Sequence, residues 1–466
     1  MPSTQQDILS FEIDPGSFKD PSGFAFQHNN HIYRAIAPSY FSNYDHLMGS
    51  GLYASLIGHK YMIGHTETNN FLSPTFADYK IIKPEQIPFI TYPYEWCFSE
   101  LKQAALLTLS VQKLALKHGM ILKDATTFNI QFSGNRPVFI DTLSFEKYNE
   151  GVPWIAYHQF CQHFLSSLTL MAYKHEGLLK LSQIFLDGIP LELSSTLLTR
   201  RSYLNSGIAS HLHIHSKIRQ KTTKKKKTEK KIVVSKKQLL YIVEHLEQTI
   251  KGLKIKRKKS QWNKYPLENS YSKNAKEEKS KIISIWLKSI APETIWDMGC
   301  NTGYYSLLAS AFCEHLIAMD EDHLCIESLY HSLSNSKTTN ILPLVIDLAN
   351  PTPAIGWENQ ERKSLLQRGT PHLVMALALL HHLRITNNIP LDKIAKSFSK
   401  MGTWLIIEFI PKNDIQIQEM LMNRKDIFED YSLNSFISVF ESFFEIKESM
   451  LLPDSERVLF LMKRKN

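Results

Sequence analysis

Short apolar segments alternate with helical patterns from residue 280 onwards, and this alternation constrains the fold more than any other feature. The strand-like segments are TIWDMG, HLIAMD, ILPLVID, HLVMALALL and WLIIEFI, and segments with helical spacing separate them. Strands that are apolar on both faces are typical of a parallel sheet covered by helices on each side. FFEIKESMLLP and RVLFLMK indicate a final strand pair. We therefore predict a doubly wound α/β domain in the C-terminal part of the chain.

Acidic residues and glycines stand at the ends of the first three predicted strands, where sheets of this kind bind their ligands. The first strand leads through Asp297 into a turn in which Gly299 and Gly303 allow the backbone to approach a ligand closely. Asp320 ends the second strand, where a carboxylate accepts hydrogen bonds from both hydroxyls of a ribose. Asp347 ends the third, where a carboxylate accepts one from an exocyclic adenine amine. The alternative is that these residues merely cap turns.

These motifs resemble those of class I S-adenosylmethionine-dependent methyltransferases, which have a Rossmann-like fold. DMGCNTG, the strand end at Asp320 and the segment LVIDL match the first three binding motifs of that family in order and spacing. GxGxxG, the usual mark of a dinucleotide fold, is absent, and Asn301 replaces a glycine that is common in the loop. The resemblance implies S-adenosylmethionine as cofactor, no obligatory metal, and a donor site that includes Leu348 and Ala376.

The transfer of a methyl group from a sulfonium is an in-line displacement, in which the enzyme aligns the reactants and excludes water. A hydroxyl acceptor is helped by a nearby base. The candidates are His381 and His382 after the fourth strand and Glu408 in the fifth, although each is also suited to packing or capping. We favour a small molecule or a glycan hydroxyl as acceptor, and we expect its pocket between the two globular units of the chain.

The segment QWNKYPLENSYSKNAKEEK precedes the α/β domain, at a place where the resembling family often folds a lid over the donor. It contains Trp262, Tyr265, Tyr271 and Lys279. A surface loop that leads into a helix is an equally good interpretation.

The basic character of the chain is local. The formal net charge is +9, but residues 217–259 hold 17 Lys/Arg and 3 Asp/Glu, so that the rest of the chain carries −5. A block of like charges is usually a solvated linker, which we favour over contact with nucleic acid or an anionic membrane. An amphipathic helix is predicted within it by Leu239, Ile242, Val243, Leu246 and Ile250. The domains expected are residues 1–215, a basic linker with a helix at 216–261, and 262–466.

The N-terminal unit contains a second motif. After a long helical pattern at 98–118, LKDATTFNI places Asp124 five residues before Asn129, and Asp141 ends a strand. This arrangement resembles kinase-like phosphotransferases, in which the first Asp accepts a hydroxyl proton and the Asn and second Asp hold magnesium. No glycine-rich phosphate loop precedes it, and Arg34 stands where the phosphate-pairing lysine is expected. We predict an α+β kinase-like domain that is not catalytic.

Nearly the whole chain resembles a bacterial family that joins a kinase-like N-terminal region to a methyltransferase domain, some members of which are named as nodulation-protein-like methyltransferases. The resembling segments are PEQIPFITYPYEW, LKDATTFNI, PVFIDTLSFE, DMGCNTG, LALLHHL and WLIIEFIPK. This resemblance implies a methyltransferase and leaves its acceptor open. Two alternatives remain: a phosphotransferase that uses Asp124, Asn129 and Asp141, or a non-catalytic module whose basic linker binds nucleic acid or an anionic surface.

Cysteine content and hydropathy predict a cytoplasmic protein. The five cysteines are odd in number and widely spaced, which argues against a disulfide scaffold. No apolar run reaches the ~18 residues that a membrane span requires, and the N-terminus lacks the basic start and apolar core of a secretion signal.

The motif HLHIH alternates three histidines, His211, His213 and His215. In a strand, this alternation places all three side chains on one face, where they could bind a metal. Because no clustered carboxylate or cysteine accompanies them, we predict a polar strand face or the edge of a linker, and no metal site.

Overall fold

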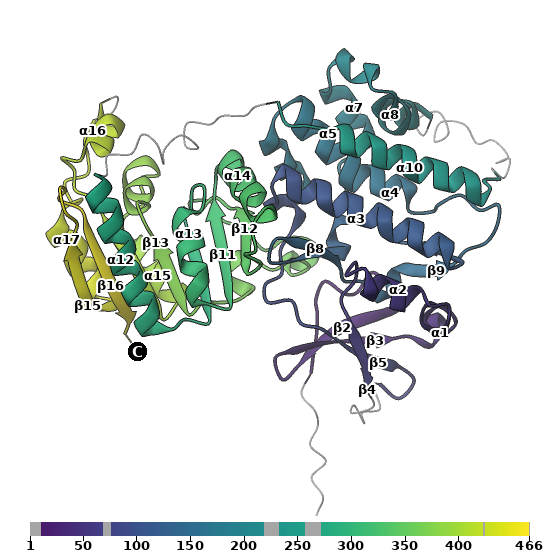
Figure 1. Ribbon diagram of the computed structural model, residues 1–466, viewed down its shortest axis with the longest axis horizontal. Helices are drawn as coiled ribbons and strands as arrows, with labels where there is room; N and C mark the ends of the chain where they lie inside the picture. The colour runs from purple at the N-terminus through teal and green to yellow at the C-terminus, as the bar shows by residue number, and fades with distance from the viewer. Residues whose placement is uncertain (1–10, 69–75, 219–232, 257–271, 423–424, 466) are drawn as a thin grey trace, which may run out of the picture.

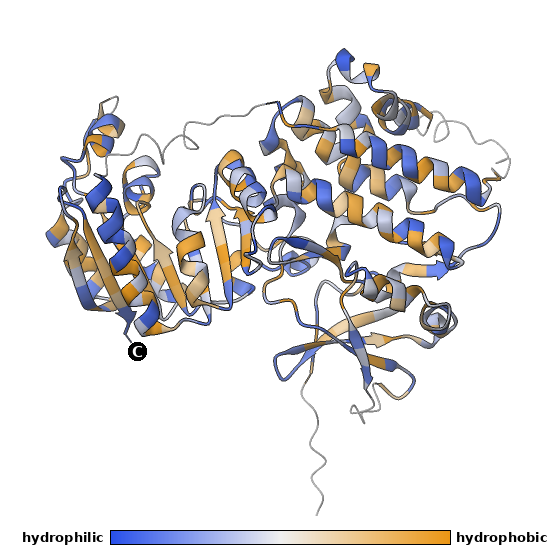
Figure 2. Cartoon of the chain, in the orientation of Figure 1, coloured by the Kyte–Doolittle hydropathy of each residue, from blue (hydrophilic) through white to orange (hydrophobic). Residues whose placement is uncertain are grey.

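The computed structural model describes residues 11–68, 76–218, 233–256, 272–422 and 425–465. These residues form an N-terminal body, 11–256, and a C-terminal body, 272–465, which lie side by side (Figure 1). The parallel strands of the C-terminal body are largely hydrophobic, whereas the helices and the strands of the N-terminal body mix hydrophobic and hydrophilic residues (Figure 2). Among the described residues, no helix combines the length and the apolar character that crossing a membrane requires.

An antiparallel sheet begins the N-terminal body. Its spatial order is β1 (Glu12–Ile13), β2 (Gly23–His28), β3 (His31–Ile36), β5 (Lys80–Pro84) and β4 (His65–Thr68). The turn between β2 and β3 consists of Asn29 and Asn30, which both adopt positive φ angles. This is the backbone that a two-residue hairpin requires, and Asn tolerates it. Two small strand pairs follow, β6 (Met120–Leu122) with β9 (Phe145–Lys147) and β7 (Ile130–Ser133) with β8 (Arg136–Phe139).

Helices make up the rest of this body. They include α1 (Phe41–Gly49), α2 (Leu52–Gly58), α3 (Phe98–Lys117), α4 (Tyr157–Phe160), α5 (Ser166–Tyr173), α6 (Leu181–Ile184), α7 (Leu191–Leu197), α8 (Ser206–Ile208) and α10 (Lys236–Gly252). Both helices expected from spacing, at 98–118 and within the basic linker, are confirmed as α3 and α10. The apolar face of α10 packs against α3, and Lys113 Nζ lies 2.8 Å from Glu247 Oε2 across this contact.

The motif HLHIH is not a strand. It lies in a π-helical turn, Ala209–Ile214, that continues from α8. His213 accepts or donates hydrogen bonds with Ser195 and Ser202, and His211 contacts Tyr157. The prediction was wrong because five alternating residues are too few to distinguish a strand from a buried helical segment. In the described part of the chain, no group of His, Cys, Asp or Glu side chains is arranged to hold a metal ion.

The C-terminal body is built on a seven-stranded sheet that confirms the predicted α/β class. Its order is β12 (Ile341–Val345), β11 (His315–Asp320), β10 (Thr294–Met298), β13 (Leu373–Ala376), β14 (Trp404–Phe409), β16 (Val458–Arg464) and β15 (Phe444–Leu451). The first five strands are parallel, β16 runs antiparallel to β14, and β15 runs antiparallel to β16. The helices are α12 (Lys273–Ile290), α13 (Tyr304–Ala309), α14 (His323–Ser334), α15 (Leu391–Met401), α16 (Ile415–Leu421) and α17 (Leu433–Glu441).

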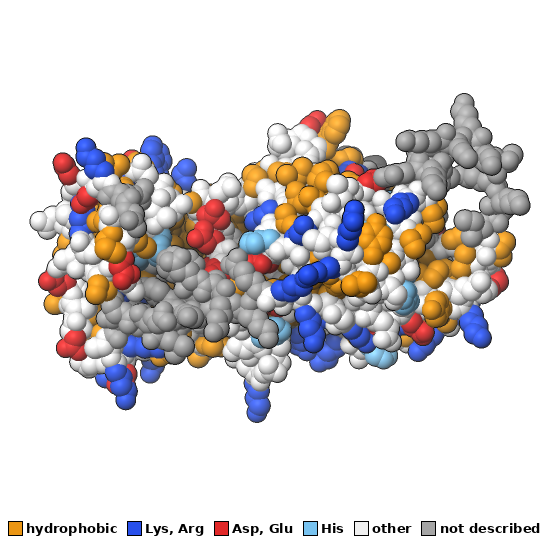
Figure 3. All heavy atoms as spheres, turned by 90° about the horizontal axis from the view of Figure 1, so that it is seen from above, with side chains coloured by type: hydrophobic (Ala, Val, Ile, Leu, Met, Phe, Trp, Pro, Cys, Tyr) orange, Lys and Arg blue, Asp and Glu red, His pale blue; other side chains and the backbone are white. Residues whose placement is uncertain are grey.

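The order of these strands reverses between β10 and β13, which follow one another in space but not in sequence. A crevice opens at the carboxyl ends of the strands at such a reversal, because the connections on its two sides lead to opposite faces of the sheet. The N-terminal body lies at the edge of this sheet that β12 forms, beside β12 and α14 (Figure 1). In the view from above, acidic side chains are visible where the two bodies meet, and hydrophobic ones gather on the N-terminal body (Figure 3).

Candidate methyl-donor site

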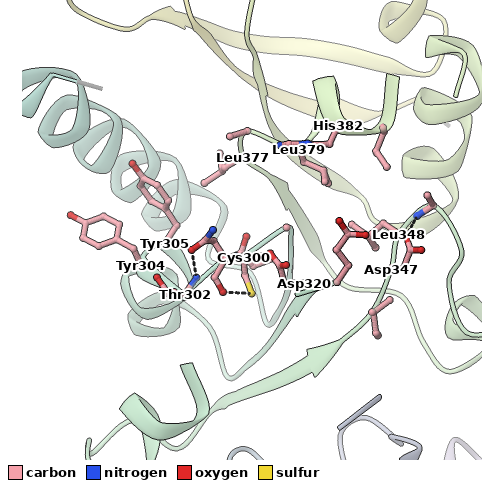
Figure 4. A pocket seen from close by; sticks show the side chains of 18 of the residues that line it. Cys300, Thr302, Tyr304, Tyr305, Asp320, Asp347, Leu348, Leu377, Leu379 and His382 are labelled. Atoms are coloured by element: carbon pink, nitrogen blue, oxygen red, sulfur yellow. Dashed lines mark hydrogen bonds between the residues drawn. The ribbon is translucent and has the colours of Figure 1, made fainter. Parts of the chain in front are cut away.

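A cavity lies at the carboxyl ends of β10, β11, β12 and β13, and it encloses about 1260 Å³ of space that is partly open to solvent. Figure 4 shows Tyr304 and Tyr305 on one side of it and Asp347 and Leu348 on the opposite side. The residues that line it all belong to the C-terminal body: Lys276, Lys279, Asp297, Gly299, Cys300, Asn301, Thr302, Tyr304, Tyr305, Asp320, Glu321, Ile346, Asp347, Leu348, Ala349, Leu377, Ala378, Leu379, His382, Leu383 and Asn387. The cavity therefore belongs to the C-terminal body alone, and the acceptor pocket expected between the two units stays a separate prediction.

The turn after β10 forms the floor of this cavity. Gly299 and Gly303 adopt φ angles of 75° and 82°, in the left-handed region. Asn301 adopts it as well, with φ at 52°, and Asn is one of the few residues with a side chain that do so readily. A Cβ on Gly303 would lie 2.4 Å from Leu329 Cδ1, so this position leaves no room for a side chain. Gly303 itself does not line the cavity but begins α13.

Two carboxylates meet this turn. Asp297 is buried, and its Oδ2 accepts a hydrogen bond from Ser306 Oγ at 2.6 Å. Asp320 accepts hydrogen bonds from the backbone N–H of Asn301 at 2.8 Å and of Asp322 at 2.9 Å. Burial raises the pKa of both carboxyls to about 6, because desolvation disfavours the charged form. Both are consequently ionised at neutral pH and present oxygen acceptors to the cavity.

The far wall follows β12. Asp347 and Leu348 line the cavity as predicted, and Asp347 Oδ1 accepts a hydrogen bond from the backbone N–H of Ala349 at 2.8 Å, which closes a tight turn. Ala376 was expected to line the site but is buried within the sheet, outside the cavity wall. Its place is taken by the three residues that follow, which leave the end of β13: Leu377, Ala378 and Leu379.

Of the three candidate bases, only His382 lines the cavity. Burial lowers the pKa of His382 to about 4, which keeps its imidazole neutral at physiological pH. His381 is buried behind it, and neither of its ring nitrogens has a hydrogen-bond partner among the described residues. Glu408 lies below the cavity, where Lys279 Nζ contacts its Oε2 at 2.8 Å and the backbone N–H of Ala378 donates to it at 2.9 Å. This carboxylate thus supports a wall of the cavity.

Several lining residues were not singled out as binding residues from the sequence. Tyr304 and Tyr305 follow the glycine turn directly, and the Nζ of Lys276 lies 4.2 Å from the ring centroid of Tyr304. Their position at the start of the helix after the turn was the available signal. Asn387 lies beyond a π-helical turn and had no such signal. Lys279 of the predicted lid segment is part of α12, whereas Trp262, Tyr265 and Tyr271 lie outside the described residues.

The kinase-like motif forms a closed network in the N-terminal body. Arg34 forms an ion pair with Asp141 Oδ1, and the hydroxyl of Ser144 donates to Asp141 Oδ2. Asn129 Nδ2 in turn donates to Ser144 Oγ at 3.0 Å, and Asp124 accepts from the backbone N–H of Thr126. The fold brings Asn129 and Asp141 together as expected, since both bond to the hydroxyl of Ser144. A metal ion bound by Asp141 would have to displace Arg34 and Ser144.

Comparisons with known proteins relate the chain to one bacterial family. No protein-family model matches it. Two solved methyltransferases align with the C-terminal body: N-methyltransferase NodS from Bradyrhizobium japonicum WM9 (42% of this chain, 99% of NodS, 12% identity, TM-score 0.32) and magnesium protoporphyrin IX methyltransferase from Synechocystis PCC 6803 with bound SAH (41% of this chain, 84% of that enzyme, 14% identity, TM-score 0.30). Nodulation protein NoeA from Rhizobium meliloti (strain 1021) is 32% identical over 464 residues, which cover 96% of this chain and 95% of NoeA. With that identity over nearly the full length of both proteins, the chain belongs to the family of nodulation protein NoeA.

Proposed function

We propose that this protein is an S-adenosylmethionine-dependent methyltransferase whose donor binds in the cavity at the carboxyl ends of β10–β13. One observation carries the proposal: the carboxylates of Asp297, Asp320 and Asp347 and the left-handed turn at Gly299 converge on a single cavity. A nucleoside with a ribose diol, an adenine amine and an amino-acid tail offers hydrogen-bond donors to each of these acceptors. The residues present therefore fit the donor.

The roles follow from position. Asp297 and the turn around Gly299 would hold the methionine part, Asp320 the ribose and Asp347 the adenine, with Leu348 against the base. When bound, S-adenosylmethionine supplies an activated methyl group. The protein aligns the acceptor and keeps water out, to which Tyr305 and Leu379 contribute apolar surface.

We further propose that His382 is the general base. Its imidazole lines the cavity and is neutral at physiological pH, so it is able to accept the proton of an acceptor hydroxyl. A small molecule or a glycan is the acceptor class that this chemistry favours. Incubation of the protein with cell extract and isotope-labelled donor, followed by identification of the labelled product, would test it. Label on protein alone would refute this acceptor class.

The donor assignment is tested by calorimetry with S-adenosylhomocysteine. The variant Asp320→Ala should lose binding, because it removes the acceptor assigned to the ribose. Asp392→Ala is the matched control, since Asp392 is an exposed carboxylate in the first turn of α15, outside the cavity. Unchanged affinity in Asp320→Ala would remove the role given to Asp320, and no binding by the wild-type protein would refute the proposed function.

For the N-terminal body, which includes α10 of the predicted linker 216–261, we infer a kinase-like scaffold without phosphotransfer, followed by a methyltransferase domain in the C-terminal body. The antiparallel sheet followed by α3 supports the scaffold, and the pairing of Asp141 with Arg34 argues against a magnesium site. Magnesium and ATP should give no thermal stabilisation of the full-length protein. A concentration-dependent rise in melting temperature would favour the phosphotransferase instead.

A further inference from the structure

Two walls of the donor cavity continue into segments that reach the N-terminal body. Glu321 lines the cavity, and α14 begins two residues later at His323. On the other side, Leu348 and Ala349 line the cavity and lead into a long loop that returns to the sheet at β13. The positions of α14 and of this loop, residues 346–372, therefore fix how far apart the two walls stand.

The loop is held by a buried ion pair. Arg368 forms a bidentate ion pair with Glu95: Arg368 Nη1 donates to Glu95 Oε2 at 2.8 Å, and Arg368 Nη2 donates to Glu95 Oε1 at 2.5 Å. The two side chains are 0% and 1% exposed. Thr352 Oγ1 also donates to Glu95 Oε1 at 2.5 Å, and the carbonyl of Thr352 accepts from the backbone N–H of Leu365 at 3.0 Å. Glu95 thus holds both arms of the loop. One contact is at Thr352, five residues after Asp347, and the other is at Arg368.

The helix is held from nearly the same point. The backbone N–H of Ser99 donates to Glu327 Oε2 at 3.0 Å, and its hydroxyl donates to Glu327 Oε1 at 2.5 Å. Glu327 lies in the second turn of α14 and is largely buried. Ser99 lies in the first turn of α3, a 20-residue helix in the core of the N-terminal body, and Glu95 lies four residues earlier in the buried turn Pro93–Glu95. A long packed helix and the buried turn that leads into it form a rigid support for the two contacts.

We propose that residues 95–99 of the N-terminal body position the two walls of the donor cavity and thereby set its affinity for the donor, a role that rests on the proposed function. Glu95 and Ser99 act as positioning residues, because neither lines the cavity. The N-terminal body would then be a required part of the methyltransferase site rather than an independent module. Two contacts from one short segment couple its placement to both walls at once.

The test is calorimetry with S-adenosylhomocysteine on full-length variants, together with their melting temperatures. Glu95→Gln leaves Arg368 buried without its counter-charge, so the double variant Glu95→Gln/Arg368→Met is made as well, since it restores neutrality and stability. If residues 95–99 position the cavity walls, the double variant should still bind S-adenosylhomocysteine about tenfold more weakly than the wild type, within the range usual for coupled sites. Thr352→Val removes a single hydrogen bond and should weaken binding in the same direction.

The control is Glu247→Gln, which breaks the ion pair to Lys113 of α3 and the pair to Lys251 within α10, both away from the cavity. It should lower the melting temperature and leave the affinity unchanged. The positioning role is refuted on its own by two results together. In the double variant, the affinity for S-adenosylhomocysteine returns to the wild-type value along with the melting temperature, and in Thr352→Val the affinity is unchanged. Failure of the wild-type protein to bind S-adenosylhomocysteine would refute the proposed function, and with it the positioning role of residues 95–99.

Discussion

Donor binding should weaken as the pH falls through about 6, because Asp297 and Asp320 both have their pKa raised to about 6 by burial. Each carboxylate loses an acceptor when it is protonated. If the donor binds only the ionised form, the dissociation constant rises about tenfold for each group between pH 7 and pH 5, and about 100-fold for the two together. The structure therefore predicts a steep dependence of donor affinity on pH between pH 7 and pH 5.

Protein stability should move in the opposite direction. A carboxyl whose pKa is higher in the folded state than its unfolded value of 3.8 binds its proton more tightly when folded. The free energy of unfolding contributed by Asp297 and Asp320 consequently increases as the pH falls from 6 to 4, by about 2 kcal/mol for each group. Weaker binding at pH 5 would therefore not reflect unfolding caused by these two groups.

The assay is calorimetry with S-adenosylhomocysteine at pH 5, 6, 7 and 8, with circular dichroism at each pH to verify the fold. In Asp320→Asn the slope of log Kd against pH should fall, because only Asp297 still titrates. A wild-type dissociation constant that stays the same from pH 8 to pH 5 would refute the reasoning that links these two carboxylates to the donor.

Three further predictions concern the supports of the cavity and its chemistry. Lys279→Met removes the counter-charge that Lys279 supplies to the buried carboxylate of Glu408 and should cost about 3–5 kcal/mol in urea unfolding, with recovery in Lys279→Met/Glu408→Gln; a loss equal in both variants would contradict the ion-pair argument. His382→Phe should lower kcat by about 100-fold or more while the donor Kd stays unchanged, and an unaltered kcat would exclude it as the base. Gly303→Ala should destabilise the protein by at least about 1 kcal/mol, since its φ is 82° and a Cβ would clash with Leu329; wild-type stability would show that the turn relaxes.

The donor cavity was largely predictable from the sequence because its parts are local. A strand that ends in an acidic residue, followed by a turn with glycines, specifies its own backbone, so Asp297, Asp320 and Asp347 reach one edge of the sheet wherever the strands are parallel. The error of one residue at Ala376 arises because the sequence shows that a strand ends but not at which residue it leaves the sheet. Glu408 was misplaced for another reason: alternation along a strand does not say which face holds the ligand.

Contacts between distant segments had no such local signal. Glu95 and Arg368 are separated by 273 residues, and neither stands out in its own segment: Glu95 ends a short turn that begins with Pro93, and Arg368 follows the short helical turn Leu365–Gln367. Burial makes this pair important for stability, because a buried charge is tolerated only when its partner is placed with good geometry. The N-terminal body and the loop 346–372 must therefore be in register for either to be stable in this arrangement. The proposed donor site, although local motifs specify it, would thus depend on a junction that only the folded chain defines, and this dependence would tie methyl transfer to the presence of the N-terminal body.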